Sequence, residues 1–153
     1  DSFLRLHGPG VGAEIMGALK FGYPGWHEDP HWKGWWGAEP PFHTPVFVLT
    51  HHPRPSFTLD DTTFHFVDGD PATVLAQARE AAGGMDVRLG GGVTTVRQFL
   101  DADLVDTLHV AVSPVVAGSG LRLWSSPDDL LDRYHLEKVL SPSGVLHHLF
   151  WRR

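Results

Sequence analysis

The segment DVRLGGGVTTVRQFL (86–100) has a β-strand pattern that runs into three glycines and then directly into a helix pattern. Glycine lets backbone amides approach a ligand closely, and the first N–H groups of a helix have no intrahelical partner. Such a junction suits a phosphate group. A tight turn without a ligand uses the same residues, since the segment lacks the G-x-G-x-x-G spacing. The segment therefore predicts a strand-turn-helix unit and leaves phosphate binding open.

Strand and helix patterns alternate along the chain. Apolar runs predict buried strands at 13–16, 45–50, 63–67 and 86–90. Residues 70–84 predict a helix with Asp70 as its N-cap, Pro71 in its first turn and glycine after its end. Its predicted buried face consists of Val74, Leu75, Ala78 and Ala82. Strands separated by helices are typical of an α/β fold, with a mostly parallel central sheet and helices on both faces.

The C-terminal part predicts three further elements. A second helix is expected at 94–103, and its core-facing residues are Val96, Phe99 and Leu100. A strand follows at 107–116, with one face made of Leu108, Val110 and Val112. The last segment predicts an antiparallel hairpin around a turn that contains Pro142 and Gly144.

Length and composition narrow the class of protein. A chain of 153 residues suits one domain, predicted to span 1–153. The net charge of -6 argues against a nonspecific nucleic-acid binder, because phosphate neutralisation needs a basic surface. No apolar run is long enough to span a membrane. The absence of cysteine excludes disulfides and thiolate zinc sites, and it fits a cytoplasmic protein.

Residues 22–44 form a long stretch without periodicity that holds four of the six tryptophans. Because disordered segments are poor in aromatic residues, this loop is predicted to be packed. Tryptophan rings offer flat faces to a pterin, a flavin-like or another aromatic ring, so a substrate-side wall is one interpretation. A small core under the loop is the other. The residues concerned are Trp26, Trp32, Trp35 and Trp36.

The same loop contains HEDPH (27–31), which matches the zinc-binding pattern H-E-x-x-H. That pattern needs both histidines on one helical face, and Pro30 disfavours a helix there. No metal site is therefore predicted. A reaction beside the loop would need a proton donor, and solvent-facing residues without a role are the alternative interpretation. The candidates are His27, Glu28, Asp29 and His31.

Hydrogen-bond donors also follow the first two predicted strands. Lys20 comes after the run at 13–16, and the donors after 45–50 are Thr50, His51, His52 and Arg54. In open α/β sheets, ligands bind beyond the carboxyl ends of parallel strands. Three strand ends that suit a phosphate group favour a dinucleotide with an extra phosphate, NADPH rather than NADH. A solvated surface turn is the alternative for HHPR.

Five segments together resemble one family: GAEIMG, PPFHTPVFVLTHHPR, DVRLGGGVTTVRQFL, LVDTLHVAVSPVVAGSGLRLW and SPSGVLHHLFW. In order and spacing they resemble the dihydrofolate reductase-like proteins of the riboflavin-biosynthesis reductase (RibD C-terminal) family. The likeness covers nearly the whole chain. It implies a three-layer dihydrofolate reductase fold, NADPH as the cofactor and a homodimer.

The resemblance also implies a cofactor site. The residues expected to cradle the pyrophosphate are Gly90, Gly91, Gly92, Val93, Thr94 and Thr95. Those expected to touch the phosphates from the other side are Gly17, Ala18, Leu19 and Lys20. The 2′-phosphate is expected among Thr50, His51, His52 and Arg54. Ala18 stands where relatives commonly have arginine, so one phosphate contact is lost and Lys20 is expected to replace part of it.

These observations predict an NADPH-dependent reductase that transfers a hydride to a small pterin-like or pyrimidine-like heterocycle, similar to the riboflavin-biosynthesis reductase or dihydrofolate reductase. The alternative is a non-catalytic protein that keeps the fold and binds a nucleotide or a flavin-like ligand. Ala18 and the missing N-terminal strand of the family favour this alternative. The family's N-terminal strand, which lines the nicotinamide and substrate pocket, has no counterpart before Asp1. That strand is expected either to lie outside this sequence or to be missing.

Overall fold

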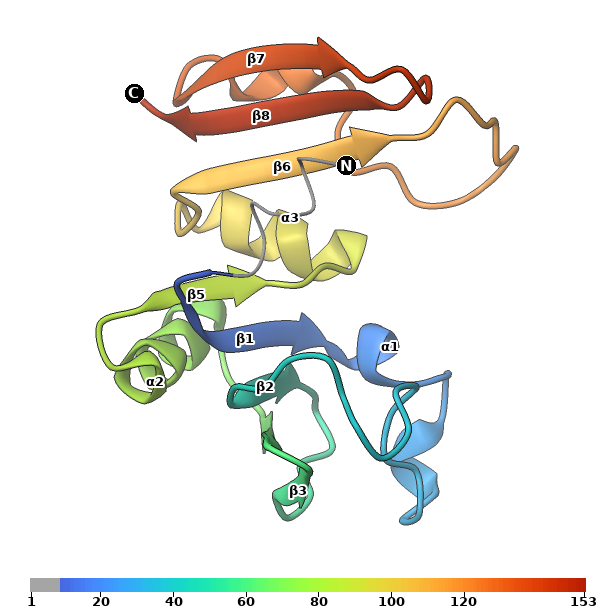
Figure 1. Ribbon diagram of the computed structural model, residues 1–153, viewed down its shortest axis with the longest axis vertical. Coiled ribbons are helices and arrows are strands. Elements are labelled where there is room, and N and C mark those ends of the chain that lie inside the picture. The colour runs from blue at the N-terminus through green and yellow to red at the C-terminus, as the bar shows by residue number, and fades with distance from the viewer. Residues whose placement is uncertain (1–8) are drawn as a thin grey trace. The chain divides into compact units, whose positions relative to one another are not determined.

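The computed structural model describes residues 9–153, and its contacts divide the chain into two compact units, Asp1–Gln98 and Phe99–Arg153 (Figure 1). Each unit has its own β-sheet. That the chain folds as one domain stays a prediction, and the expected N-terminal strand lies outside the described residues. Among the helices of residues 9–153, none is both long enough and apolar enough to cross a membrane.

The first unit contains a five-stranded sheet in the order β3-β4-β2-β1-β5. Its strands are β1 (Val11–Gly17), β2 (Val46–Leu49), β3 (Phe57–Leu59), β4 (Thr62–Val67) and β5 (Asp86–Leu89). β1 pairs in parallel with β2 and β5, and β2 pairs in parallel with β4, whereas β3 is antiparallel to β4. The predicted α/β class with a mostly parallel sheet is confirmed. β3 is an additional edge strand that the apolar runs did not predict.

The α-helices of residues 9–153 are α1 (Ala18–Phe21), α2 (Pro71–Ala82) and α3 (Val93–Asp101), and a 3-10 turn η2 (Trp26–Glu28) follows α1. α2 begins and ends as predicted, because the Asp70 carboxylate accepts a 2.8 Å hydrogen bond from the Thr73 amide and Gly83 adopts a left-handed φ of 60°. The four predicted core residues of α2 are buried, and this helix packs against β1 and β5.

One face of the five-stranded sheet is covered by aromatic side chains. The strand register places Met16, Val48 and Phe66 side by side on this face, and neighbouring residues extend the row. Together with Phe21 and Trp26 they form a buried cluster, against which residues of the 22–44 loop pack. The predicted packing of this loop is confirmed. Here the loop covers the sheet where a helix was expected.

The second unit contains a three-stranded antiparallel sheet in the order β6-β8-β7. Its elements are β6 (Thr107–Val112), the 3-10 turn η3 (Pro127–Leu130), β7 (Tyr134–Leu140) and β8 (Leu146–Arg152). The predicted hairpin turn is present: the Gly144 amide donates to the Ser141 carbonyl at 2.9 Å, and Gly144 has a φ of 83°.

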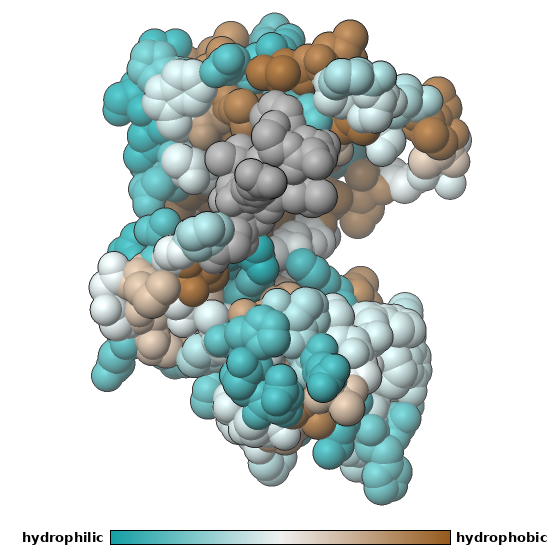
Figure 2. All heavy atoms as spheres, in the orientation of Figure 1, coloured by the Kyte–Doolittle hydropathy of each residue, from teal (hydrophilic) through white to brown (hydrophobic). Residues whose placement is uncertain are grey.

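β6 is shorter than predicted, because the strand expected at 107–116 ends at Val112. Pro114 has no N–H to donate to a neighbouring strand, so pairing stops before it. The apolar residues beyond β6 are therefore exposed, with Val115 76% and Val116 94% accessible. Figure 2 shows hydrophobic side chains on this segment between β6 and η3.

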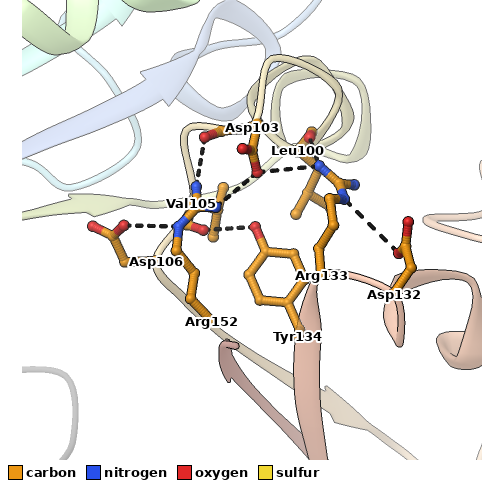
Figure 3. A network of polar contacts seen from close by, with 8 residues as sticks. All are labelled: Leu100, Asp103, Val105, Asp106, Asp132, Arg133, Tyr134 and Arg152. Atoms are coloured by element: carbon orange, nitrogen blue, oxygen red, sulfur yellow. Dashed lines mark hydrogen bonds and ion pairs between the residues drawn. The ribbon is translucent and has the colours of Figure 1, made fainter.

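A network of polar contacts fixes the turn between α3 and β6 (Figure 3). The Asp103 carboxylate accepts hydrogen bonds from Arg152 at 2.8 Å and from Arg133 at 3.3 Å, which link the turn to β8 and to the residue just before β7. Tyr134 donates its phenolic hydrogen to the Val105 carbonyl at 2.6 Å. Burial raises the pKa of Tyr134, so the phenol keeps the proton that it donates.

Asp103→Asn is expected to lower the free energy of unfolding near neutral pH. The hydrogen bond from Arg152 lowers the pKa of Asp103, so the carboxylate stabilises the folded state above its unfolded pKa of about 3.9. This contribution disappears as the pH falls through the lower, folded pKa. Asparagine tolerates the left-handed φ of 56° at this position. In urea unfolding, the variant should therefore have a lower free energy of unfolding than wild type at neutral pH. In acid the two free energies should converge. An equal difference at both pH values would exclude an electrostatic contribution.

Candidate cofactor-binding site

Three of the predicted site segments lie at one edge of the parallel sheet. β1, β2 and β5 run in the same direction (Figure 1). The segment 17–20 begins with the last residue of β1, and the segments 50–54 and 90–95 follow the carboxyl ends of β2 and β5. β1 lies between the other two strands, so the first segment lies between the second and the third. Sequence reasoning placed these residues at strand ends, and the structure brings the ends together.

The segments after β1 and β5 are in contact. A Cβ atom on Gly17 would collide with the Thr95 hydroxyl, so only glycine allows this approach. The ammonium of Lys20 donates a hydrogen bond to the Gly90 carbonyl. Burial lowers the pKa of Lys20, while the charge of Glu14 raises it. Ala18 is half-buried against the aromatic cluster, and Leu19 is exposed.

The glycines after β5 form a bend that leads into α3. Gly91 and Gly92 have left-handed φ angles of 99° and 61°, which favour glycine. Apart from its chain neighbours, no atom of residues 9–153 lies within 4 Å of a Cβ built on Gly91, so this part of the chain leaves the outer side of the bend open. α3 starts at Val93, and the first N–H groups of a helix lack intrahelical partners. This triglycine bend, residues 90–92, can therefore present amides to an anion.

The segment after β2 presents two histidines to solvent. The Thr50 hydroxyl is buried and accepts a 3.0 Å hydrogen bond from the His52 amide. The His51 ring is exposed and pairs with Asp68 at 3.1 Å. The His52 ring stacks on His27 of the tryptophan loop, with centroids 3.8 Å apart and planes 5° from parallel. His51 and His52 are thus accessible to a phosphate, and Thr50 is a local turn residue.

Arg54 turns away from solvent and holds the tryptophan loop. Its guanidinium donates to the carbonyls of Trp32 at 2.9 Å, Asp29 at 3.0 Å and Trp26 at 3.2 Å. The same group lies 4.8 Å from the Trp26 ring centroid, within cation–π range. Three of its five donor hydrogens therefore serve the loop. The contact with a 2′-phosphate stays a prediction.

The four loop tryptophans divide into two kinds. Trp26 is 2% exposed, and Trp36 stacks on Phe64 in the core cluster. Trp32 and Trp35 lie further out and pack edge to face, with centroids 4.6 Å apart. Trp35 is 58% exposed. Trp26 and Trp36 thus serve the core, whereas Trp35 exposes much of its ring to solvent. A substrate contact of these tryptophans stays a prediction.

HEDPH does not form an α-helix. The 3-10 turn η2 ends at Glu28, and Asp29 has extended angles, as expected before Pro30. The Asp29 carboxylate accepts a 2.9 Å hydrogen bond from the His31 backbone amide, and this bond closes a local turn. Residues 27–31 therefore lack the helix that the zinc-binding pattern needs, as the position of Pro30 predicted. The expected absence of a metal stays a prediction. Which of the four candidate proton donors acts, if any, stays a prediction.

Two polar groupings were not predicted. The first is an ion pair between the buried Glu14 on β1 and Arg88 on β5. The second unites His43, Asp60 and Asp61, whose ligand-type atoms lie within 4.8 Å of one another on the surface. Each grouping joins residues far apart in the sequence, so only the strand register could have indicated the first.

Comparison with known proteins identifies relatives of this arrangement. The family model described as the RibD C-terminal domain matches residues 25–141, more than half of the chain. No curated protein gives a significant match. Among solved structures, a protein described as a riboflavin biosynthesis protein from Shewanella sp. PV-4 is 20% identical, with a TM-score of 0.63, and the match covers 94% of this chain and 75% of that one.

Two further structures extend the comparison. A pyrimidine reductase-like protein from Corynebacterium diphtheriae is 15% identical, with a TM-score of 0.52 and coverage of 94% of this chain and 76% of its own. Dihydrofolate reductase from Enterococcus faecalis, solved in complex with NADP(H), is 13% identical, with a TM-score of 0.57 and coverage of 99% and 80%. At these identities the structural likeness shows the fold alone, which is the predicted dihydrofolate reductase-like fold.

Proposed function

Because the chain belongs to the RibD C-terminal domain family, a family of reductases that typically use NAD(P)H, we propose that it is an NADPH-dependent reductase of a small pterin-like or pyrimidine-like heterocycle. The observation that carries the proposal is the open triglycine bend at the N-terminus of α3, with the Lys20 ammonium at its base. The nearby His51 and His52 add donors at the end of β2, the side where a 2′-phosphate is expected.

The residues at this edge fit the phosphate groups of NADPH. The described residues leave space beside Gly91, the glycines of the bend have the backbone angles that expose amides, and the Lys20 ammonium bonds to the Gly90 carbonyl at its start. The nicotinamide supplies the hydride when it is bound. The protein must then hold the cofactor against the substrate and supply a proton.

Each part of the site has a role in this proposal. The bend binds and orients the pyrophosphate. Trp35 offers aromatic surface to the heterocycle, and Arg54 keeps the tryptophan loop in place. His27, Glu28, Asp29 and His31 remain the candidate proton donors on that loop.

Titration of NADPH and NADH against tryptophan fluorescence tests the cofactor. Tighter binding of NADPH than of NADH is expected, because only NADPH carries the 2′-phosphate. Oxidation of bound NADPH by a panel of pterins and pyrimidines then tests the reaction. If neither dinucleotide binds, the proposed function is wrong.

A binding protein without turnover is the second candidate function. The Ala18 side chain has no hydrogen-bond donor, and Arg54 donates three hydrogen bonds to the loop. These two positions therefore leave few cationic donor hydrogens for a phosphate. Binding of NADPH without its oxidation by any tested heterocycle would favour this candidate.

Gly91→Ala is expected to weaken NADPH binding about tenfold or more, because an L-residue is strained at a φ of 99° and the bend must shift. Beyond its chain neighbours, the added methyl group meets no atom of the described residues within 4 Å, so the expected loss comes from the backbone angle and not from a clash with them. Gly84→Ala is the matched control, with a φ of 89° and open space at a remote site. If both variants bind NADPH with the same affinity, the bend does not contribute to NADPH binding.

A further inference from the structure

A buried ion pair lies beneath the triglycine bend. Glu14 is 1% exposed, and its strand partner in the register of β1 and β5 is Arg88. The Arg88 guanidinium bonds to one oxygen of the Glu14 carboxylate, Oε1. The other oxygen, Oε2, is buried without a hydrogen-bond partner among residues 9–153. A buried carboxylate with an unsatisfied oxygen is costly, which points to a role beyond packing.

The unsatisfied oxygen faces the start of the bend. A Cβ built on Gly90 would lie 3.5 Å from Glu14 Oε2 and 2.5 Å from the Lys20 ammonium. The absence of a side chain at Gly90 therefore lets the carboxylate and the ammonium approach the same point. Glu14, Arg88 and Lys20, one anion and two cations, form a charge cluster against the Gly90 peptide.

The geometry of the peptide bond connects this cluster with the bend. The Gly90 carbonyl accepts a hydrogen bond from Lys20 and so points toward the cluster. In a trans peptide the carbonyl and the next N–H point in opposite directions, and the described chain contains no cis peptide. The Gly91 amide therefore points away from the cluster, toward the open side of the bend.

We propose that Glu14 is a positioning residue for anion binding at the triglycine bend: its carboxylate and the Lys20 ammonium meet beside Gly90, and Lys20 holds the Gly90 carbonyl so that the Gly91 amide faces the ligand. The inference rests on the proposed function, in which the bend binds the pyrophosphate. Glu14 itself is buried and does not touch the ligand.

The electrostatic directions agree with this role. Burial, the largest effect, lowers the pKa of Lys20; the Glu14 charge raises it and the nearby Arg88 lowers it. Without the Glu14 charge, Lys20 would lose its proton at a lower pH. A neutral amine would hold the Gly90 carbonyl more weakly. The affinity of the bend for an anion should therefore fall as Lys20 loses its proton.

The test compares the NADPH affinity of wild type, Glu14→Gln and Lys20→Arg from neutral to alkaline pH. In wild type the affinity should fall as Lys20 loses its proton. In Glu14→Gln the same fall should begin at a lower pH, with affinity about tenfold below wild type in that range. Lys20→Arg should show no such fall, because a guanidinium stays charged. Glu80→Gln, which removes an exposed charge from α2, is the matched control.

Two further measurements keep the inference separate from the proposed function. The Lys20 side-chain titration, followed by NMR, should move to lower pH in Glu14→Gln even without ligand. Inorganic pyrophosphate is a second probe that needs only the bend. Pyrophosphate binding without NADPH binding rejects the proposed function, and the same pH comparison then decides the role of Glu14. Identical pH profiles in wild type and Glu14→Gln, or binding of neither anion, overturn the inference.

Discussion

Arg54→Met is expected to release the tryptophan loop and to lower the free energy of unfolding by about 3 kcal/mol. The variant keeps most of the side-chain volume but leaves the carbonyls of Trp26, Asp29 and Trp32 without their donor. Hydrogen bonds from a charged group contribute about 1.5–3 kcal/mol each, and bonds that share one guanidinium do not add fully. Denaturant unfolding measures the loss, and tryptophan fluorescence reports the released loop.

Two variants show whether the geometry of the guanidinium is responsible. Arg54→Lys keeps the charge but cannot reach three carbonyls with one ammonium, so a partial loss is expected. Arg79→Met removes an exposed arginine from α2 and should change stability by about 0.5 kcal/mol or less. A stable Arg54→Met protein that has lost only NADPH affinity would instead identify Arg54 as a phosphate ligand.

Elements with local signals could be predicted from the sequence. α2 carries its own cap, its first-turn proline and its terminal glycine, so its bounds depend on neighbouring residues alone. β3 was missed because it has three residues and pairs with β4 through a tight turn in which Asp60 has a φ of 54°. Such a short edge strand is determined by its partner strand, and it has no periodicity of its own.

The sequence predicted where the candidate site lies, at the ends of the strands, but not which groups its side chains contact. The strand ends followed from the rule for open α/β sheets, and the structure brings 17–20 against 90–95 as that rule requires. Arg54 was predicted for a phosphate, and its donors point to loop carbonyls 22 to 28 residues earlier in the chain. The pair Glu14 and Arg88 joins residues 74 positions apart. These choices depend on tertiary packing, for which single residues carry no signal.

Phe21→Ala is expected to cost about 3–5 kcal/mol of unfolding free energy, because it leaves a cavity where a buried aromatic ring is surrounded by other rings. Phe21 is fully buried, and its ring centroid lies 4.8 Å from that of Trp26, 5.2 Å from Phe66 and 5.5 Å from Phe64. The surrounding rings are rigid and cannot collapse easily into the space. Urea unfolding measures the loss.

Leu19→Ala is the matched control for Phe21→Ala. It removes an apolar side chain from the same four-residue helix, α1, but at a position that is 71% exposed, so a change of about 0.5 kcal/mol or less is expected. Equal losses in both variants would mean that α1 and not the aromatic cluster limits stability.

Because Lys20 lies between Leu19 and Phe21, Phe21→Ala should also displace the Lys20 ammonium from the Gly90 carbonyl. NADPH affinity should then fall in Phe21→Ala, under conditions where the variant stays folded, and be retained in Leu19→Ala, which would connect the core of the first unit with the triglycine bend.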